Sequence, residues 1–521
     1  MPKYSTPAHK LHPEENTVSV VDQNAGRQRV LNINKAIGYA SSGVEYAQKY
    51  RHQLLKNIPW ADDYYIFTDY IGTNICVFSD LMGFPRDKVI WIYNYLAGRE
   101  TLPCTLTIAD FERTIGQDYT LADGISAADN HYTDLLLTDA PVRYRIWKTR
   151  ENCIDRVDTI ISDQLERVDH YDQSLNNTEY YQGGQLIRRT FFTSNGDLAL
   201  EQFYENREIA QTIIGGTIID GRSLFLQYFF KKLFAESGDV VIVDRTLDVI
   251  DAVYPTVGNN RLFSVVHAEH YHLGSEKDAL LWNNHYEHVF THADKFEGII
   301  VSTSRQKKTL EAQLKEQGQT AAVVHIPVGS VPKVTSTKDY AHNSLLTASR
   351  LADEKHVDLL IKAVIEARKT ISDLTLDIYG EGKRAELEKL ITDADASGFI
   401  FLKGHQDLTG KYANYALYVT ASGSEGFGLS LMEGVAQGLP IVGFDVEYGN
   451  REMVESGVNG LLIPYAKSNA DVTSLAAAIV QVLQQEDLDQ FRQESAKKAR
   501  AYLGRAVQKK WEELLVGKGG A

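Results

Sequence analysis

The amino-acid sequence predicts an α/β protein in which two layered domains are accompanied by one antiparallel β region. Apolar strand runs such as RVLNIN and DVVIVDR alternate with helical segments over 29–104 and 226–330, and a second alternating series follows from about 331. Between them, residues 105–225 contain short alternating runs separated by turn sequences such as QGG and SNGD. Alternating strands and helices predict parallel sheets covered on both faces, and the short alternating runs predict an inserted antiparallel sheet.

The first α/β domain begins after residues 1–28, which are polar and without periodicity and are expected to be a flexible lead-in. We expect RVLNIN to be a strand, GYASSG a small-residue loop and VEYAQKYRHQLLKNI a helix with apolar residues at helical spacing. After the insertion, the domain is expected to resume with LFLQYFFKKLF and the buried strand DVVIVDR. It then continues through RLFSVVHAEH and EGIIVSTSRQ, so it comprises 29–104 and 226–330.

The second α/β domain follows HIPVGSVPKVTSTKDYAH, a Pro/Ser/Thr-rich break that marks the domain boundary. Its expected strand segments are SLLTASRL, LTLDIYGEG, GFIFLKG, LYVTASGSEGFG, LPIVGFD and GLLIP. We assign 331–500 to this domain and 501–521 to a C-terminal helix that could return to the N-terminal domain. The Lys/Arg-rich end, from about 484 to 517, is expected to be helical and solvated.

Composition excludes several classes of protein. The chain has 521 residues and a formal net charge of -15, which argues against a nucleic-acid binder because phosphate contacts need a basic surface. Cys76, Cys104 and Cys153 form no CxxC pair, which favours a reducing compartment. The polar N-terminus has no signal-peptide pattern, and no apolar run reaches the roughly 18 residues of a membrane helix. We therefore expect a cytoplasmic protein.

The strongest chemical signal is SEGFGLSLMEGVAQGLPIVG, at positions 424–443. A strand is expected to end at LYVTAS, and a glycine-bearing turn then opens a helix at about Leu429. Such a turn lets the backbone approach a ligand, and the helix N-terminus offers free N–H groups to an anion. Glu425 precedes the turn and Glu433 lies eight residues later, so one carboxylate can reach a sugar hydroxyl and the other a ribose diol.

This stretch closely resembles the E-x7-E signature of retaining, nucleotide-sugar-dependent glycosyltransferases with the GT-B fold, in which two Rossmann-like domains face a cleft. SRLADEKHVDLLIKA resembles the Arg-x4-Lys segment of that family, so Arg350 and Lys355 are implied to hold the donor diphosphate. YGEGKRAELEKL and FLKGHQDL resemble strand ends near the nucleoside, which implies Gly380 and His405. EMVESGVNGLLIP resembles a late strand, and IPVGSV the interdomain hinge. The resemblance implies that Glu433 holds the ribose, while Glu425 and the amides of Gly426, Phe427 and Gly428 position the sugar hydroxyls. Leu429 is a further donor-binding candidate.

The N-terminal half is similar to a more particular group. INKAIGYASSGVEYAQKYR, the insertion and VVHAEHY together resemble the glycosyltransferase of the accessory Sec system, which starts O-glycosylation of serine-rich-repeat adhesins. That resemblance implies a homologous non-catalytic partner subunit, an adhesin acceptor, and membrane contact that is only peripheral and made through the partner. Gly38 and Gly43 in the loop GYASSG are candidates for contact with the diphosphate, although small residues serve a tight turn equally well.

The expected reaction moves a sugar from a UDP-sugar to Ser or Thr hydroxyls with retention of configuration and no metal cofactor. GlcNAc is favoured over glucose, which differs at one substituent. A metal-dependent GT-A enzyme would need Asp-x-Asp at a strand end, whereas 393–395 and 487–489 lie in charged, helical segments. The alternatives that stay open are a wall teichoic acid glycosyltransferase, another GT-B enzyme such as a starch-type synthase or a sugar epimerase, and a non-catalytic GT-B subunit that binds adhesin.

Six of the 15 histidines fall between positions 267 and 292. His288 and His292 have the spacing of a helical zinc pair, but Val289 stands where a zinc protease would carry its glutamate. His285, His288 and His292 are expected to lie beside an apolar face made by Trp282, Tyr286, Val289, Phe290 and Ala293. His267 closes the strand run LFSVV, and that position resembles the sugar-facing histidine of the family, near the donor C6 hydroxyl. His270 is the second candidate for this role, and His272 is expected to lie in a loop.

Overall fold

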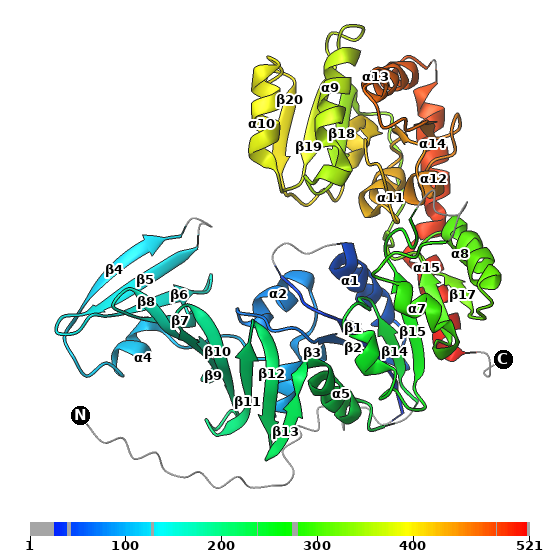
Figure 1. Cartoon of the computed structure of the whole chain (residues 1–521). Coiled ribbons are helices and arrows are strands. Elements are labelled where there is room, and N and C mark those ends of the chain that lie inside the picture. Colours follow the sequence, from blue (N-terminus) through cyan, green and yellow to red (C-terminus); the bar gives the residue numbers. More distant parts are fainter. Residues whose placement is uncertain are drawn as a thin grey trace. The chain divides into compact units, whose positions relative to one another are not determined.

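The computed structural model of the protein describes residues 26–38, 43–126, 130–236, 238–272, 280–485 and 487–517. Its contacts divide the chain into two compact units (Figure 1). The first contains Met1–Glu45 and Pro59–Leu262, and the second contains Tyr46–Ile58 and Phe263–Ala521. Helix α1 (Gly43–Leu55) therefore begins in the first unit and contributes most of its length to the second.

In the first unit, parallel strands run in the order β14-β1-β2-β3. Their bounds are β1 Gln28–Asn34, β2 Ala61–Phe67, β3 Val89–Trp91 and β14 Val240–Val243. Every residue of β2 and β14 is buried, as expected for strands of a parallel sheet covered on both faces. The helical segments of this unit are α2 Ile75–Met82, η1 Arg86–Lys88, α3 Ile92–Leu96, α4 Ile108–Glu112, α5 Gly221–Leu233 and α6 Ile250–Val253.

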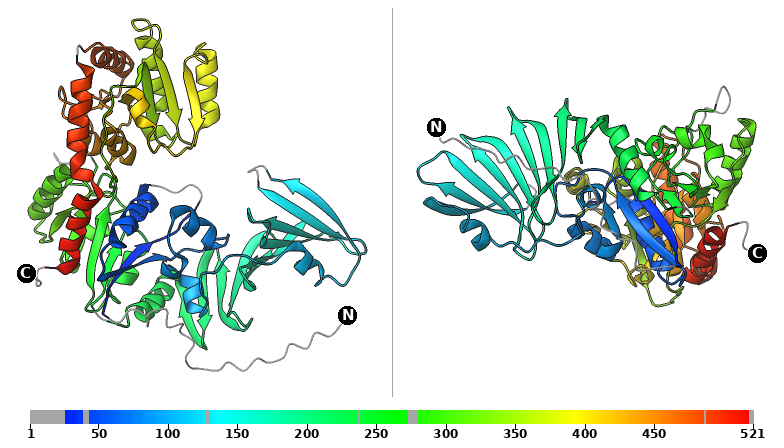
Figure 2. Two further views of the ribbon diagram at one scale, coloured as in Figure 1. Left: turned by 180° about the vertical axis from the view of Figure 1, so that it is seen from behind. Right: turned by 90° about the horizontal axis from the view of Figure 1, so that it is seen from below.

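The insertion forms one antiparallel sheet in which the strands β4 to β13 pair in chain order. Figure 2 shows these strands, coloured cyan to green, as one continuous twisted sheet. Their bounds are β4 Tyr119–Ile125, β5 His131–Leu137, β6 Val142–Lys148, β7 Ile154–Ile161, β8 Gln164–Tyr171, β9 Leu175–Gln182, β10 Gln185–Phe192, β11 Leu198–Glu205, β12 Glu208–Ile214 and β13 Thr217–Asp220. Tight turns such as Gly183–Gly184, where both φ angles are positive, connect neighbouring strands. The predicted antiparallel insertion is thus confirmed.

A buried polar network in this sheet is centred on Glu179 of β9, which is 6% exposed. Arg189 of β10 donates to Glu179 Oε2 at 3.0 Å, and His170 Nε2 lies 2.8 Å from Oε1. Tyr70 and Tyr181 donate their hydroxyls to the same carboxylate, each at 3.0 Å. Burial alone would raise the pKa of Glu179, but the hydrogen bond with His170 and the charge of Arg189 lower it to about 2. The negative charge of Glu179 is therefore balanced by Arg189, and its oxygens accept hydrogen bonds from side chains of the same chain.

The second unit contains β15 from Phe263 onward, followed by β16 and β17, and the three strands pair in this order. The bounds of this part are β15 Arg261–Val266, α7 Glu287–Thr291, η2 Ala293–Lys295, β16 Gly298–Val301, α8 Ser304–Glu316 and β17 Val323–His325. Tyr286, Val289, Phe290 and Ala293 are all buried. The predicted apolar face beside the histidines is therefore confirmed at these four positions.

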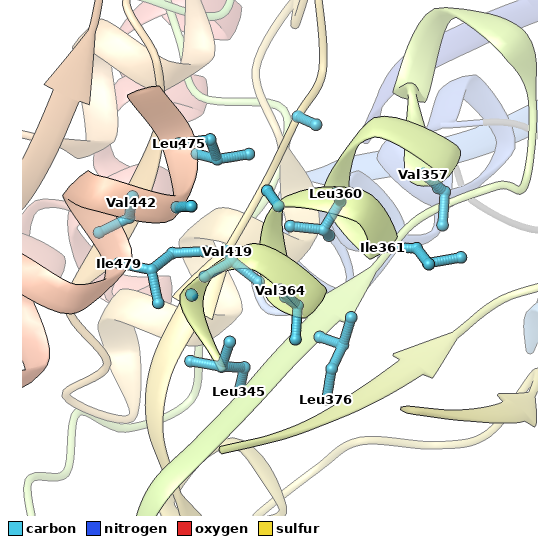
Figure 3. Close-up of a cluster of buried hydrophobic side chains, with 14 of the residues drawn as sticks. Leu345, Val357, Leu360, Ile361, Val364, Leu376, Val419, Val442, Leu475 and Ile479 are labelled. Atoms are coloured by element: carbon cyan, nitrogen blue, oxygen red, sulfur yellow. The ribbon is translucent and has the colours of Figure 1, made fainter. Parts of the chain in front are cut away.

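The rest of the second unit contains a six-stranded parallel sheet with the order β20-β19-β18-β21-β22-β23. The strands are β18 Ala341–Ala348, β19 Thr375–Tyr379, β20 Ile400–Gly404, β21 Tyr415–Val419, β22 Ile441–Phe444 and β23 Gly460–Ile463. The helices are η3 Asp353–Lys355, α9 Val357–Ala367, α10 Arg384–Asp393, η4 Tyr412–Asn414, α11 Leu429–Ala436, α12 Gly449–Met453 and α13 Ala470–Leu483. Apolar side chains of α9 and α13 pack with those of β18, β19, β21 and β22 into one core (Figure 3).

The chain continues through α14 (Leu488–Ala499), η5 (Arg500–Tyr502) and α15 (Gly504–Val516). The expectation that this end is helical is confirmed, but the expectation that it is solvated is wrong in part. The side chain of Arg492 is buried and donates to three backbone carbonyl oxygens, those of Thr337, Ala413 and Tyr415. Trp511 is also buried. A charge-rich sequence concealed these buried positions because an arginine with satisfied donors can enter a core.

Among the described helices, none has the length and apolar character needed to cross a membrane.

Candidate active site

The candidate site lies at the point where the strand order of the six-stranded sheet reverses. From β18 the chain adds β19 and β20 on one side, and it then returns to place β21 on the other side of β18. Ligands of open α/β sheets bind outside the carboxyl ends of the strands at such a switch point. The segment after β18 carries Arg350 and Lys355, and the segment after β21 carries Glu425, so the two predicted motifs meet at this point.

Lys355 and Glu425 form an ion pair, with Lys355 Nζ 2.6 Å from Glu425 Oε2. The two side chains are only 14% and 20% exposed, respectively. Both are therefore partly withdrawn from water, where an ion pair is screened less than at the surface. An ammonium group has three donors, so Lys355 can hold Glu425 and still bind a phosphate oxygen.

Arg350, the second predicted cation, has a different partner. Its guanidinium donates at 2.8 Å to Glu354 Oε1, four residues along the chain, and its side chain is 63% exposed. The structure thus brings Lys355 and Glu425 into contact but places Arg350 in solvent beside Glu354. A guanidinium carries five donors, so Arg350 can keep Glu354 and also contact a diphosphate.

Backbone packing fixes the loop between Glu425 and α11. A Cβ atom on Gly426 would lie 2.3 Å from the carbonyl oxygen of His267, so this loop approaches the end of β15 more closely than a side chain permits. Gly428 has a φ of 79° and precedes Leu429, the first residue of α11. Phe427 is buried, and the Glu425 carbonyl accepts hydrogen bonds from the amides of Tyr448 and Gly449. The predicted glycine turn before α11 is therefore present.

Glu433, in the second turn of α11, accepts hydrogen bonds from two tyrosines. The Tyr50 hydroxyl donates to Oε1 at 2.5 Å, and the Tyr412 hydroxyl donates to Oε2 at 2.9 Å. Burial raises the pKa of Glu433 above its usual range, and the charge of Asp407 adds to this, while the two tyrosine hydrogen bonds oppose it. Among the described residues, Glu433 has no ion-pair partner.

The structure separates the two candidate sugar-facing histidines. His270 is fully buried, with Nε2 2.7 Å from Gln313 Oε1 and Nδ1 3.2 Å from the Tyr448 hydroxyl. Burial lowers its pKa to about 4, so the ring is neutral. His267 is half-buried at the end of β15, and its backbone carbonyl faces Gly426. Of the two candidates, His267 is therefore the more accessible one.

The remaining histidines of the cluster are exposed: His272, His285, His288 and His292. The rings of His288 and His292 stack with their centroids 5.5 Å apart. Within the described part of the chain, no group of three or more His, Cys, Asp or Glu side chains is arranged to hold a metal ion.

The other predicted donor-binding residues lie at several places. Gly380 follows β19, and a Cβ atom there would overlap the Ser349 carbonyl, so this glycine is required where the ends of β18 and β19 converge. His405 is exposed directly after β20. Gly43 is the exposed first residue of α1, and Gly38 is half-buried. Residues 39–42 of the predicted loop GYASSG lie outside the described residues.

Three residues near the site were not found by sequence reasoning. Tyr50 and Tyr412 hold Glu433. Tyr50 lies within INKAIGYASSGVEYAQKYR and Tyr412 shortly after FLKGHQDL, but neither stretch assigned a role to its tyrosine. Glu269 has a pKa raised by burial and is hydrogen-bonded to Ser424, while its Oε1 is buried without a partner. Glu269 lies in the segment HAEHYH, two residues after the candidate His267. A carboxylate so close to a candidate site residue could have identified Glu269 from the sequence.

The fold and this site define a GT-B glycosyltransferase. Residues 342–485 match the family described as glycosyl transferases group 1, and residues 129–212 match the GtfA extended beta-sheet domain. The UDP-N-acetylglucosamine–peptide N-acetylglucosaminyltransferase GtfA subunit of Streptococcus parasanguinis is 35% identical over 93% of this chain and 98% of its own. The chain belongs to this GtfA family.

Solved structures agree with this membership. The pneumococcal O-GlcNAc transferase GtfA, in complex with UDP and GlcNAc, superposes with a TM-score of 0.88 and 34% identity, covering 94% of this chain and 98% of that chain. The GtfA/B complex gives a TM-score of 0.85 and 34% identity, covering 94% and 99%. The prediction of a GT-B fold of the accessory Sec type is confirmed.

Proposed function

We propose that this protein transfers N-acetylglucosamine from UDP-GlcNAc to Ser and Thr hydroxyls of a serine-rich-repeat adhesin, with retention of anomeric configuration. The observation that carries the proposal is the Lys355–Glu425 ion pair at the switch point of a chain that matches GtfA subunits along nearly its whole length. The pneumococcal relative was solved in complex with UDP and GlcNAc. GlcNAc is therefore the preferred sugar, and glucose is the alternative to be tested.

In the proposed mechanism, the UDP-sugar lies beyond the carboxyl ends of β18 and β21. Lys355 and Arg350 stabilise the negative charge that grows on the leaving diphosphate. Glu433 accepts hydrogen bonds from the ribose hydroxyls. Glu425 and the backbone amides of 426–428 orient the sugar, and His267 lies near its C6 hydroxyl.

The bond changes need no dedicated protein base. The bond between the anomeric carbon and the diphosphate oxygen breaks as the acceptor oxygen bonds to the same face of that carbon. The proton of the acceptor hydroxyl passes to an oxygen of the leaving UDP. We infer no metal requirement, because Lys355 and Arg350 supply the positive charge that a metal ion would otherwise provide.

A second subunit completes the proposal. A relative of this chain was solved as a GtfA/B complex. We therefore expect this chain to act in the cytoplasm with a homologous non-catalytic subunit. Any contact with the membrane would then be peripheral and made through that subunit.

The domain limits given above, with 105–225 as the inserted domain, stay predictions.

The decisive experiment incubates the protein and its partner subunit with a serine-rich peptide and either UDP-GlcNAc or UDP-glucose. Mass spectrometry should detect an added N-acetylhexosamine, and NMR of the product should show the α configuration of the donor. Activity should persist in EDTA. A peptide of unchanged mass with both donors would refute the function, and inverted configuration would refute the retaining mechanism alone.

Variants of the ion pair separate its two roles. Lys355→Ala should lose both UDP affinity and transfer, because it removes a cation from the diphosphate. Glu425→Gln should lose transfer but keep UDP affinity, since the remaining Lys355 cation has no competing carboxylate. Glu386→Gln, on the exposed face of α10, is the matched control and should behave as wild type. Wild-type turnover in the Lys355→Ala variant would contradict the assignment of this site.

A further inference from the structure

Helix α1 contributes a residue to the environment of Glu433, although the two positions are 383 residues apart in sequence. Tyr50 donates its hydroxyl to Glu433 Oε1 at 2.5 Å, while Tyr412 donates to Oε2 at 2.9 Å. Each carboxylate oxygen thus accepts one hydrogen bond from a tyrosine hydroxyl, and the two tyrosines come from different parts of the second unit.

The two tyrosine hydroxyls orient the Glu433 carboxylate but leave part of its hydrogen-bonding capacity unused. An ionised carboxylate can accept about four hydrogen bonds, two at each oxygen. Tyr50 and Tyr412 use one position at each oxygen, which leaves one at each for a further donor. A ribose diol offers two adjacent hydroxyl donors, so its geometry fits the positions that remain.

Charge makes these two hydrogen bonds important. Among the described residues, no lysine or arginine pairs with Glu433, and Asp407 disfavours its ionised form. The side chain is mostly withdrawn from solvent, where hydrogen bonds to a charged group are stronger than in water. The charge and orientation of this carboxylate therefore depend on the hydroxyl groups around it.

Tyr50 is presented by a well-anchored segment. The guanidinium of the neighbouring Arg51 lies 4.9 Å from the ring centroid of Trp511, and Arg51 is only 2% exposed. Leu54 and Leu55 of the same helix are buried. The phenol therefore reaches Glu433 from a helix whose place in the second unit is fixed by α15.

We propose that Tyr50 is a positioning residue of the donor site, which holds the Glu433 carboxylate in the orientation that accepts both hydroxyls of the UDP ribose. This inference rests on the proposed function, in which Glu433 binds the ribose. It extends the donor site to helix α1, a part of the chain that precedes the first donor-domain strand by almost 300 residues.

The test compares UDP with 2′,3′-dideoxyuridine diphosphate by isothermal titration calorimetry. Wild type should bind UDP more tightly than the dideoxy compound. Tyr50→Phe should weaken UDP binding about 3- to 20-fold, because a hydrogen bond to a half-buried charge is lost, and should leave binding of the dideoxy compound unchanged. Tyr46→Phe, one turn earlier on α1, is the matched control and should change neither affinity, since within the described chain the Tyr46 hydroxyl makes no hydrogen bond to Glu433.

Three outcomes would overturn the proposal. Equal UDP affinity in wild type and Tyr50→Phe would remove any role, and tighter UDP binding in the variant would mean that Tyr50 blocks the ribose. An equal loss for both nucleotides would indicate a structural role only. If wild type did not discriminate between the nucleotides, the ribose contact of Glu433 would fail together with Tyr50, whereas the proposed function fails only if GlcNAc transfer is absent.

Discussion

Glu179 in the ten-stranded sheet is buried and Glu433 of α11 is half-buried. Tyrosine hydroxyls hold both carboxylates, but the pKa values of the two groups shift in opposite directions. Glu179 also receives Arg189 and His170, and its pKa falls to about 2. Within the described ranges, Glu433 accepts hydrogen bonds only from the hydroxyls of Tyr50 and Tyr412, and burial raises its pKa. The charge of Glu179 is thus balanced by residues of the chain itself. The carboxylate of Glu433 has no such cation among the described residues and keeps hydrogen-bonding capacity that a ligand could use.

The largest expected effect follows from Glu179→Ala. The substitution would remove the carboxylate that holds the half-buried Arg189 and the buried His170, which costs about 3–5 kcal/mol of unfolding free energy. We would measure denaturant unfolding, together with hydrogen exchange of β9 and β10. Glu208→Ala, at an exposed position of the same sheet, is the control and should stay within about 0.5 kcal/mol of wild type. An unfolding midpoint equal to that of wild type would contradict the idea that Glu179 is structural.

The second prediction concerns pH. Because the folded pKa of Glu179 is about 2, below its ordinary value of 4.5, this carboxylate stabilises the fold above pH 4.5 and loses that contribution as pH falls toward 2. The loss amounts to about 3 kcal/mol if the shift is fully expressed. The gap in unfolding free energy between wild type and Glu179→Gln should therefore narrow as pH falls from 5 to 3.

The opposite sign is expected for Glu433. Its folded pKa is raised, so the ionised carboxylate lowers stability at neutral pH, and that penalty disappears as pH falls through the folded pKa. Glu433→Gln should therefore gain its greatest stability over wild type at neutral pH. Equal slopes for the two glutamates would break the comparison.

The third prediction concerns ligand binding by Glu433. Glu433→Gln should weaken UDP binding about 10- to 100-fold, because hydrogen bonds from the ribose to a charged acceptor are lost. Calorimetry would measure the affinity, and thermal unfolding should show no loss of stability. Glu179 variants that remain folded should bind UDP as wild type does, and a reduced affinity there would show that the two regions are coupled.

The smallest expected effects compare two tyrosines. Tyr181→Phe removes one hydrogen bond to Glu179 and should cost about 0.5–1.5 kcal/mol of stability with unchanged UDP affinity. Tyr412→Phe removes one hydrogen bond to Glu433 and should chiefly weaken UDP binding. Equilibrium unfolding and calorimetry on both variants would test this. The opposite assignment of effects would contradict the distinction between the regions.

Local patterns in the sequence predicted the parts of the fold and site that depend on short-range chemistry. The alternation of strands and helices, the antiparallel insertion and the glycine turn before α11 all follow from periodicity and turn residues. Glu425 and Lys355 were found because each belongs to a motif with fixed spacing. Their contact across 70 residues then follows from the pairing of β18 with β21.

The rest depends on tertiary packing, which leaves no local signal. Tyr50 reads as one more aromatic residue of an amphipathic helix until its helix packs near α11. The choice between His267 and His270 needed the positions of Gln313 and Tyr448, which enclose the His270 ring. Arg492 appeared to be a surface charge because its three carbonyl acceptors come from distant segments.

The stacking of Arg51 on Trp511 has a consequence for the order in which the protein is built. Ribosomes add roughly 5–20 residues per second, so α1 is synthesised roughly 20 to 90 s before Trp511. During that interval the tyrosine-bearing helix lacks the support that fixes it. The contact between Arg51 and Trp511 therefore forms only in the last stage of synthesis, and under the proposed role of Tyr50 the donor site would be completed at that stage.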